Sequence, residues 1–146
     1  MALVHRGWRD AQTLRQSVLG WPIGAVPGDE DRAAQHRFSL DADGRDAGVV
    51  SFSPHPCPLR QGRSAFYFWA MAVRPDVQRH GHGTKLVNAV LEAAREADAT
   101  VVWADARLSA VPFYVRLGAC AEGATYVDDV TGLQDQRVVF DLPHER

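Results

Sequence analysis

The sequence has little cysteine and no long apolar run. Its two cysteines, Cys57 and Cys120, lie far apart and follow no CxxC spacing, so they indicate neither a disulfide framework nor a zinc site. No segment approaches the roughly 20 apolar residues that span a bilayer. The N-terminal segment Met1–Arg6 lacks the apolar core of a secretory signal. We therefore expect a reduced, cytoplasmic protein with no membrane-spanning segment and no bound metal.

Net charge is also small. The 16 Lys and Arg residues against 18 Asp and Glu residues give a formal net charge of -2, and Lys85 is the only lysine. This balance gives no sign of a surface for nucleic acid or an anionic membrane. Hydrophobic residues at 46% and charged residues at 23% are typical of a globular domain. A chain of this length buries about 68–70% of its unfolded surface, so we expect one domain over residues 1–146.

The hydrophobic pattern predicts a mixed α/β domain. Short apolar or alternating segments bounded by Gly, Pro and Asp predict strands over residues 2–8, 36–40, 47–53, 65–73, 101–104, 119–127 and 136–142. Helical spacing of apolar residues predicts helices over residues 10–19, 84–97 and 109–116, with Asp10 as the N-cap of the first. The strand, helix and strand over 65–104 form a βαβ-type unit within a mostly antiparallel pattern.

The turn that follows the strand over 65–73 has the composition of a phosphate-binding loop. It contains Gly81 and Gly83, which let an anion approach the backbone closely. The first N–H groups of the helix that follows have no intrahelical acceptor, and the helix dipole adds partial positive charge there. From Val77 to Leu91 the chain has no acidic residue, whereas Arg79 and the only lysine are cationic. The local charge therefore favours an anionic ligand.

The turn also has interpretations other than a phosphate site. The two glycines could simply form a tight turn before a helix. The Rossmann fingerprint would need a third glycine and a downstream acid, and the G-x-x-x-x-G-K-S/T spacing of a P-loop is absent. His80 and His82 are two residues apart, but no third metal ligand lies nearby in the sequence. A nucleotide or another phosphate ligand is the remaining alternative.

Two motifs in the sequence resemble those of the GNAT superfamily of N-acyltransferases. The first is similar to the superfamily's acetyl-CoA-binding pattern, Q/R-x-x-G-x-G/A, and reads Val73-x-Pro75-x-x-Gln78-x-x-Gly81-x-Gly83-x-x-Leu86. The second is similar to A-x-x-F-Y-x-x-L-G-F and reads Ala110-x-x-Phe113-Tyr114-x-x-Leu117-Gly118. The resemblance implies a mostly antiparallel sheet of six to seven strands, flanked by helices and splayed between the strands at 65–73 and 101–104.

The resemblance also implies an acetyl-CoA-dependent N-acyltransferase and suggests its site residues. The candidates for binding acetyl-CoA along the first motif are Met71, Ala72, Val73, Gln78, Arg79, His80, Gly81, His82, Gly83 and Thr84. Tyr114 of the second motif would lie near the CoA sulfur and protonate the leaving thiolate as general acid. Arg107 takes the position of an asparagine that contacts pantetheine in many members, and it is a further candidate for cofactor binding.

The general base stays open. An amine with a pKa near 10 must lose a proton during acyl transfer, and the strand over 65–73 contains no carboxylate. Asp105, at the end of the next strand, is one candidate. His36 is another, because a neutral imidazole can accept a proton, and a chain of water molecules is the third. The acidic run over 29–31 is expected to be a solvated loop that could attract a cationic amine.

Two functions from different classes fit these observations. The first is an N-acetyltransferase that uses acetyl-CoA and a small-molecule or amino-acid-like amine, with peptide N-termini as further possible acceptors. The second is a non-catalytic acyl-CoA-binding or regulatory module on the same fold, since a fold does not determine function. The expected partner is a small amine, not nucleic acid or membrane, and a homodimer is compatible with the resemblance.

Overall fold

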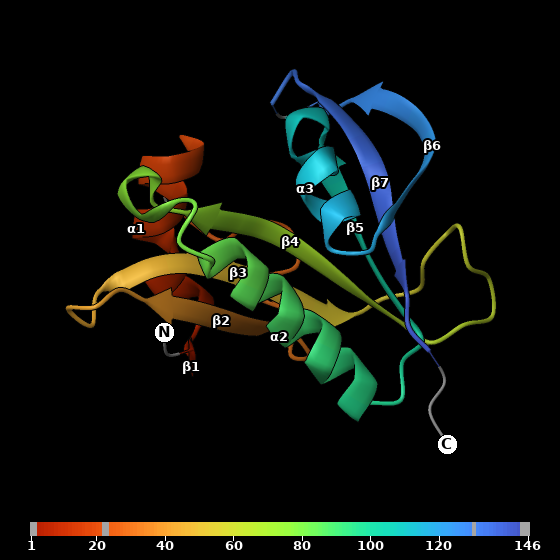
Figure 1. The fold of residues 1–146 in the computed structure, drawn as a ribbon, viewed down its shortest axis with the longest axis horizontal. Coiled ribbons are helices and arrows are strands. Elements are labelled where there is room, and N and C mark those ends of the chain that lie inside the picture. Colours follow the sequence, from red (N-terminus) through yellow and green to blue (C-terminus); the bar gives the residue numbers. More distant parts are fainter. Residues whose placement is uncertain (1–2, 22–23, 130, 144–146) are drawn as a thin grey trace. The chain divides into compact units, whose positions relative to one another are not determined.

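The computed structural model describes residues 3–21, 24–129 and 131–143 (Figure 1). The strands are β1 (Leu3–His5), β2 (Gln35–Leu40), β3 (Asp46–Pro54), β4 (Ala65–Val73), β5 (Val101–Arg107), β6 (Cys120–Val127) and β7 (Gln134–Asp141). The helices are α1 (Gln12–Leu14), α2 (His82–Glu96) and α3 (Val111–Arg116). Short 3-10 turns cover Trp8–Ala11, Pro75–Val77 and Leu108–Ala110, and a π-helical turn covers Arg15–Leu19.

The described strands form one 7-stranded sheet in the order β1-β2-β3-β4-β5-β7-β6. The pairs β1–β2, β2–β3, β5–β7 and β6–β7 are antiparallel. β4 and β5 pair in parallel, from Ala65 opposite Val101 to Tyr67 opposite Trp103. A parallel pair requires a long crossover connection, and the chain between β4 and β5 contains α2. The predicted mixed α/β class with a mostly antiparallel sheet is confirmed.

The chain divides into two compact units. The first comprises residues 1–54 and 68–93, and the second comprises residues 55–67 and 94–146. β4 belongs to both, because its first three residues lie in the second unit and the rest lie in the first.

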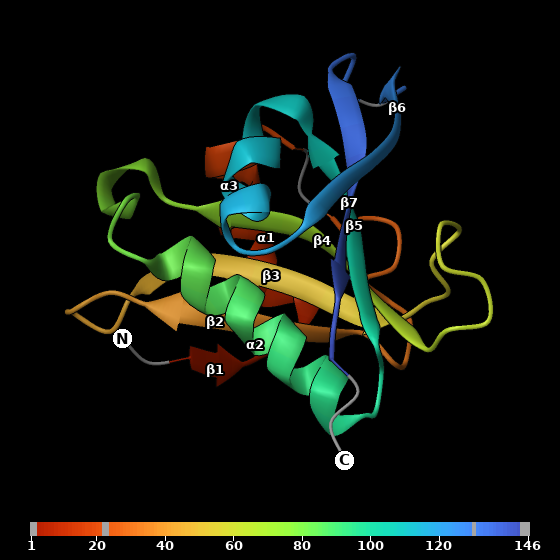
Figure 2. The ribbon, with the colours of Figure 1, turned by 45° about the vertical axis from the view of Figure 1, so that its right-hand side comes forward.

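In the first unit, helical segments cover both faces of the β2–β3 hairpin (Figure 2). Leu14 of α1 shares a core cluster with Phe38 and Val49. On the other face, a Cβ added at Gly48 of β3 would lie 3.0 Å from Leu86 Cδ1 of α2. The absence of a side chain at this glycine therefore lets α2 approach the sheet. Because both faces are covered, β3 is buried along almost all of its length.

α2 forms because its apolar residues recur at helical spacing. Leu86, Val87 and Val90 are fully buried, and Leu91 is nearly so. Burial of each such side chain contributes about 1.5–3 kcal/mol, which holds the N-terminus of α2 against the sheet. Among the described residues, no helix is long and apolar enough to cross a membrane.

In the second unit, β5 has two different faces. Trp103 and Val101 pack with Cys57, Ala65 and Val139 in one cluster. The alternate residues of β5 are short and buried on the opposite face. This alternation decides which β5 side chains can reach the polar groups of β4 and β7.

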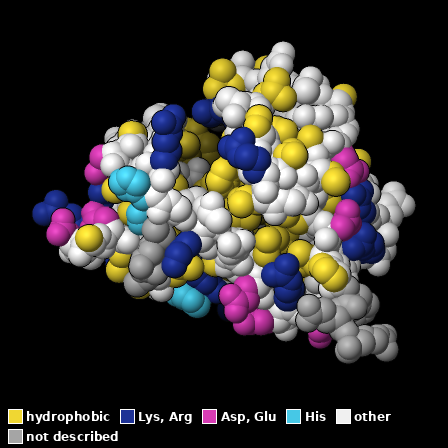
Figure 3. Space-filling model, in the orientation of Figure 1, with side chains coloured by type: hydrophobic (Ala, Val, Ile, Leu, Met, Phe, Trp, Pro, Cys, Tyr) yellow, Lys and Arg dark blue, Asp and Glu magenta, His cyan; other side chains and the backbone are white. Residues whose placement is uncertain are grey.

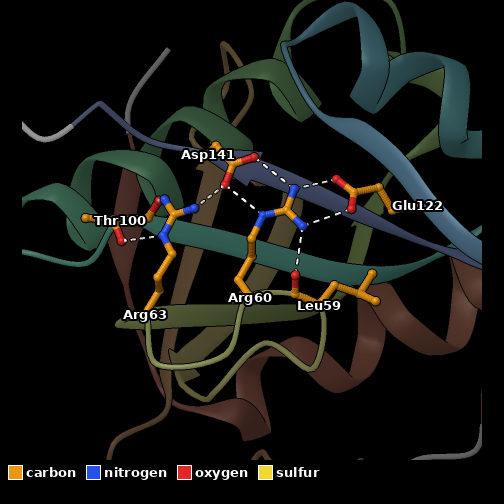
Figure 4. Close-up of polar contacts among 6 residues, drawn as sticks. All are labelled: Leu59, Arg60, Arg63, Thr100, Glu122 and Asp141. Atoms are coloured by element: carbon orange, nitrogen blue, oxygen red, sulfur yellow. Dashed lines mark hydrogen bonds and ion pairs between the residues drawn. The ribbon is translucent and has the colours of Figure 1, made fainter.

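An ion-pair network holds the loop between β3 and β4 to the end of β7 (Figure 4). Arg60 donates two hydrogen bonds of 2.9 Å to Asp141 and also pairs with Glu122 of β6. Arg63 donates to Asp141 at 2.7 Å and to the Thr100 carbonyl at 2.8 Å. These contacts raise the pKa of the Arg60 guanidinium and lower those of the two carboxyls. The loop is therefore anchored within the second unit.

Most predicted elements are present, and the differences lie mainly at their ends. β4 has the predicted bounds, whereas β1 ends at His5 and the chain turns into a 3-10 segment at Trp8. Asp10 lies inside that segment and makes no capping hydrogen bond, so its prediction as an N-cap is wrong. β5 continues to Arg107, three residues beyond the predicted end.

Candidate functional site

The 78–84 loop, comprising Gln78–Thr84, joins the 3-10 turn after β4 to the first turn of α2. Arg79 and Gly81 have positive φ angles of 70° and 87°. Such left-handed residues turn successive N–H groups toward one side and form an anion-binding concavity. The backbone N–H of Lys85 donates to the Gly81 carbonyl at 3.0 Å. The three N–H groups of residues 82–84 precede this first helical bond, so they have no intrahelical acceptor.

The side chains of Arg79 and Lys85 add positive charge around this loop. Arg79, His80 and Lys85 are exposed. Within the described part of the chain, Arg79 has no ion pair. A Cβ added at Gly81 would meet no atom within 4 Å, so this glycine is required by its φ angle and leaves open space above the backbone. The donor groups and the charge fit a phosphate or pyrophosphate.

Gln78 and Arg74 fix the loop from its N-terminal side. The Gln78 Nε2 atom donates to the Val73 carbonyl at 3.1 Å. Arg74 forms ion pairs with Asp41 at 2.9 Å and with Asp76 at 3.0 Å. The backbone N–H of Arg45 and then Arg74 lower the pKa of Asp41, Arg74 lowers the pKa of Asp76, and the two carboxylates raise the pKa of the Arg74 guanidinium. The side chain of Gln78 therefore supports the loop rather than pointing into the space above it.

His82 is buried beneath the loop, and its ring is hydrogen-bonded to β2. Its side chain is 5% exposed, and its Nδ1 atom lies 3.0 Å from Ser39 Oγ of β2. Burial and the neighbouring His80 and Arg74 lower the pKa of the ring, which favours neutral imidazole. His82 can therefore contribute its backbone N–H, rather than its ring, to an anion at the start of α2.

An open groove of about 700 Å³ borders the loop within the first unit. Its polar lining combines the β2–β3 turn with the chain after β4 and comprises Asp41, Asp43, Arg74, Asp76, His80 and His82. Figure 3 shows acidic, basic and histidine side chains gathered at this end of the molecule. Among the described residues, no group of three or more His, Cys, Asp or Glu side chains could hold a metal ion.

The C-terminal half of β4 carries a backbone irregularity next to the predicted thioester contacts. Ala70 has a φ angle of 54°, a left-handed conformation that costs an L-residue about 1–2 kcal/mol. Such a residue interrupts the alternation of a strand and re-aims its neighbours. Met71 and Val73 are half-buried, and Ala72 is buried. Ala70 is therefore the residue at which the β4 backbone departs from extended geometry.

Tyr114 lies in α3 of the second unit. Its side chain is 6% exposed, and its ring contacts Phe113 with 5.2 Å between centroids. Burial raises the pKa of the phenol to about 12. The hydroxyl therefore keeps its proton at neutral pH, which a general acid requires.

Asp105 and Arg107 occupy the C-terminal end of β5 in the second unit. Tyr67 donates its hydroxyl to Asp105 Oδ2 at 3.2 Å, and burial raises the pKa of this tyrosine. Arg137 of β7 lies 3.3 Å from the other carboxylate oxygen. Arg107 is opposite Asp135 in the β5–β7 register. Asp105 is thus a half-buried carboxylate oriented by Tyr67 and Arg137. Arg107 lies across the strand pair from the carboxylate of Asp135.

His36 lies in a buried polar network of the first unit. Its Nδ1 atom is 2.6 Å from Ser51 Oγ. Arg15 Nη2 donates to the same hydroxyl oxygen at 2.5 Å. The Ser51 hydroxyl oxygen accepts from Arg15 and forms one further hydrogen bond with His36 Nδ1, whose direction is set by the tautomer of the ring. Burial lowers the pKa of His36, which favours a neutral ring, and its Nδ1 atom is already engaged by Ser51.

Asp29 is a residue whose role the sequence pattern did not indicate. The acidic run predicts a solvated loop, which is wrong for Asp29: its side chain is fully buried and forms an ion pair with Arg15 at 2.6 Å. Glu30 and Asp31 are exposed, as expected. The one signal available was Arg15 itself, an arginine next to Leu14 on the apolar face of the helical segment. A charge at such a position needs a buried partner.

Solved acetyltransferases have the same fold along nearly the whole chain. An aminoglycoside 6'-N-acetyltransferase complexed with coenzyme A is 12% identical, with 100% of both chains covered and a TM-score of 0.75. A chimeric spermidine N-acetyltransferase from Vibrio cholerae is 13% identical, with 97% of this chain and 96% of that chain covered and a TM-score of 0.71. A chain of the NatC complex bound to Gag peptide and CoA is 12% identical, with 98% of this chain and 100% of that chain covered and a TM-score of 0.71.

No curated protein matches the sequence. The model of the acetyltransferase (GNAT) family matches residues 7–119, a range that includes both sequence motifs and most of the elements described above. The expected class of acetyl-CoA-dependent N-acyltransferase is thereby confirmed. The chain belongs to the acetyltransferase (GNAT) family.

Proposed function

We propose that this chain transfers an acetyl group from acetyl-CoA to the amine of a small-molecule or amino-acid-like acceptor by direct attack. The observation that carries the proposal is the 78–84 loop, where two left-handed residues and the start of α2 offer unpaired N–H groups beside cationic side chains. Two of the solved structures with this fold are named as acetyltransferases of amines, an aminoglycoside and spermidine. The family match supports the cofactor, and the loop supports its binding mode.

In this proposal the backbone of residues 82–84 binds the pyrophosphate of acetyl-CoA. Arg79 and Lys85 add charge at the rim, and their exposure lets them follow the phosphates. Gln78 and His82 act through the backbone, because both side chains already have partners inside the protein. Hydrogen bonds to charged groups contribute about 1.5–3 kcal/mol each, so loss of loop geometry should weaken cofactor binding strongly.

The backbone of β4 after Ala70 supplies the second set of contacts. Acetyl-CoA brings the thioester whose carbonyl carbon the amine attacks. A peptide N–H near Met71 or Val73 donates to the carbonyl oxygen as negative charge develops on it. Such a donor stabilises the oxyanion more than the substrate carbonyl and so raises the rate. The left-handed Ala70 is the local reason why these peptide groups differ from an ordinary strand.

Two proton transfers complete the reaction. Tyr114, neutral at pH 7 because burial raises its pKa to about 12, donates a proton to the leaving thiolate. The attacking amine passes its proton to Asp105 and on to water. Asp105 is favoured over His36 because its side chain keeps 27% exposure. The Nδ1 atom of His36, by contrast, is occupied by a serine hydroxyl in the interior.

The test combines calorimetry with a thiol-release assay. Calorimetry should show that the purified chain binds CoA and that changes in the 78–84 loop weaken this binding. The thiol-release assay should show that the chain releases free thiol from acetyl-CoA in the presence of at least one amine of a broad panel. ATP should bind much more weakly than CoA. Binding of CoA without transfer to any amine would favour the acyl-CoA-binding module. Equal binding of ATP and CoA would contradict the proposed ligand.

A further inference from the structure

Asp29 is the centre of a buried polar cluster in the first unit. The Asp29 cluster comprises Arg15, Asp29, His36, Ser51 and Trp69. Asp29 Oδ2 accepts from Arg15 Nη1 at 2.6 Å and from the Val26 N–H at 2.9 Å, and Oδ1 accepts from Trp69 Nε1 at 3.0 Å. One carboxylate therefore connects a helical turn, a loop and β4.

The charge of Asp29 is already balanced inside the protein. Arg15 is 2% exposed and Asp29 is fully buried at their side chains, and the guanidinium also donates to Ser51. A buried carboxylate paired in this way has no free charge with which to attract a cationic amine. The role of Asp29 must therefore be sought in what its second oxygen holds.

That second oxygen holds the indole of Trp69, which the adjacent loop also packs against. Gly28 precedes Asp29, and a Cβ added to it would lie 3.1 Å from Trp69 Cζ2. Its φ angle of 96° is one that only glycine adopts easily. Gly28 and Asp29 thus fix the indole by contact on its ring and by a hydrogen bond at its nitrogen.

Trp69 directly precedes the left-handed residue of β4. Ala70 has a φ angle of 54°, and such a conformation persists only when its surroundings determine it. A tryptophan held at both its ring and its nitrogen provides such a constraint on one side of Ala70. On the other side lie Met71 and Val73, whose backbone is proposed to contact the thioester.

We infer that Asp29 is a positioning residue for acyl transfer, acting through Trp69 on the β4 backbone at Ala70 and Met71. This inference rests on the proposed function, because it assumes that the acyl group lies against these peptide groups. Loss of the Asp29–Trp69 bond should leave pyrophosphate binding at the 78–84 loop unchanged. It should slow the chemical step, since a displacement of about 1 Å can cost about a hundredfold in rate.

The primary variant is Trp69→Phe, which removes the indole donor and leaves the ion pair of Asp29 with Arg15 intact. The matched control is Trp21→Phe in the same unit, because the buried Nε1 atom of Trp21 has no hydrogen-bond partner among the described residues. We expect Trp69→Phe to lower kcat about tenfold or more, with the dissociation constant of CoA and the KM for acetyl-CoA within about twofold of the control. Equal kcat values for the two variants at equal melting temperature would overturn the inference.

A second measurement does not depend on turnover. In the nitrogen–proton spectrum of the labelled protein, Asp29→Asn should move the indole N–H resonance of Trp69 and leave that of Trp21 in place. Addition of acetyl-CoA should shift the backbone amides of Met71 and Val73 in the wild type and in Trp21→Phe, but much less in Trp69→Phe. If these amides shift equally in Trp69→Phe, the positioning role is wrong. If they shift as expected and no amine is acetylated, Asp29 still orients the β4 backbone against bound acetyl-CoA, and the proposed transferase activity is what fails.

Discussion

Gln78 donates a hydrogen bond from its side chain to the backbone carbonyl of Val73, 3.1 Å away, and so ties the 78–84 loop to the end of β4. The two segments that the proposed function assigns to different parts of acetyl-CoA are thereby held together within one unit. The geometry of the 78–84 loop therefore depends on a support at the Val73 end of β4.

Replacement of Gln78 by Ala should therefore weaken CoA binding without preventing folding. One neutral hydrogen bond contributes about 0.5–1.5 kcal/mol, so we expect the dissociation constant of CoA to rise about fivefold in calorimetry. Gln12→Ala is the matched control, because Gln12 also donates from an exposed side chain to a backbone carbonyl, at 3.2 Å from Arg9. A dissociation constant that is the same in both variants would show that the loop does not need this bond.

Tyr114→Phe should separate chemistry from binding. The variant keeps the buried ring and loses the hydroxyl, so we expect kcat to fall about a hundredfold while the dissociation constant of CoA changes little. Stopped-flow measurement of thiol release gives kcat, and calorimetry gives the dissociation constant of CoA. Because burial raises the pKa of this phenol to about 12, the wild type should show no loss of activity from its ionisation below about pH 10. An unchanged kcat would exclude Tyr114 as the acid.

The two buried histidines, His36 and His82, should make the free energy of unfolding depend on pH. Burial lowers the pKa of His36 and of His82, so the folded state binds fewer protons than the unfolded state, whose histidines titrate near 6.5. Their contribution to stability is complete above pH 6.5 and is lost as pH falls through the folded-state pKa. The free energy of unfolding from urea titrations should therefore decrease between pH 6.5 and pH 5, before the carboxyls titrate.

His36→Asn tests this dependence, because an amide can still form a hydrogen bond with Ser51 and cannot become charged. We expect a smaller loss of stability on acidification than in the wild type, with His82 accounting for the rest. His80→Asn, which replaces an exposed histidine, should follow the wild type. Parallel curves for all three proteins would mean that His36 does not titrate differently on unfolding.

Local patterns predicted the segments that carry the cofactor proposal. The apolar run of β4 and the helical spacing of α2 are each complete within about fifteen residues of sequence, so their positions follow from nearest-neighbour chemistry. The Asp29 cluster depends on partners 14 and 40 residues away. No local pattern encodes such contacts, and an acidic run in a loop with proline and glycine favoured solvent exposure. The left-handed Ala70 is also invisible in sequence, because alanine rarely adopts that conformation.

Asp105→Asn tests the route of the amine proton. The amide keeps the shape of the side chain and can still accept from Tyr67, which donates to the carboxylate at 3.2 Å, but it cannot take up a proton at neutral pH. If Asp105 receives the proton, kcat should fall about a hundredfold, and the slow rate should recover as pH rises toward the amine pKa. Asp98→Asn is the control, because Asp98 is exposed with a φ angle of 60° that asparagine adopts readily. An Asp105→Asn enzyme with the same kcat and pH profile as this control would assign the proton to water alone.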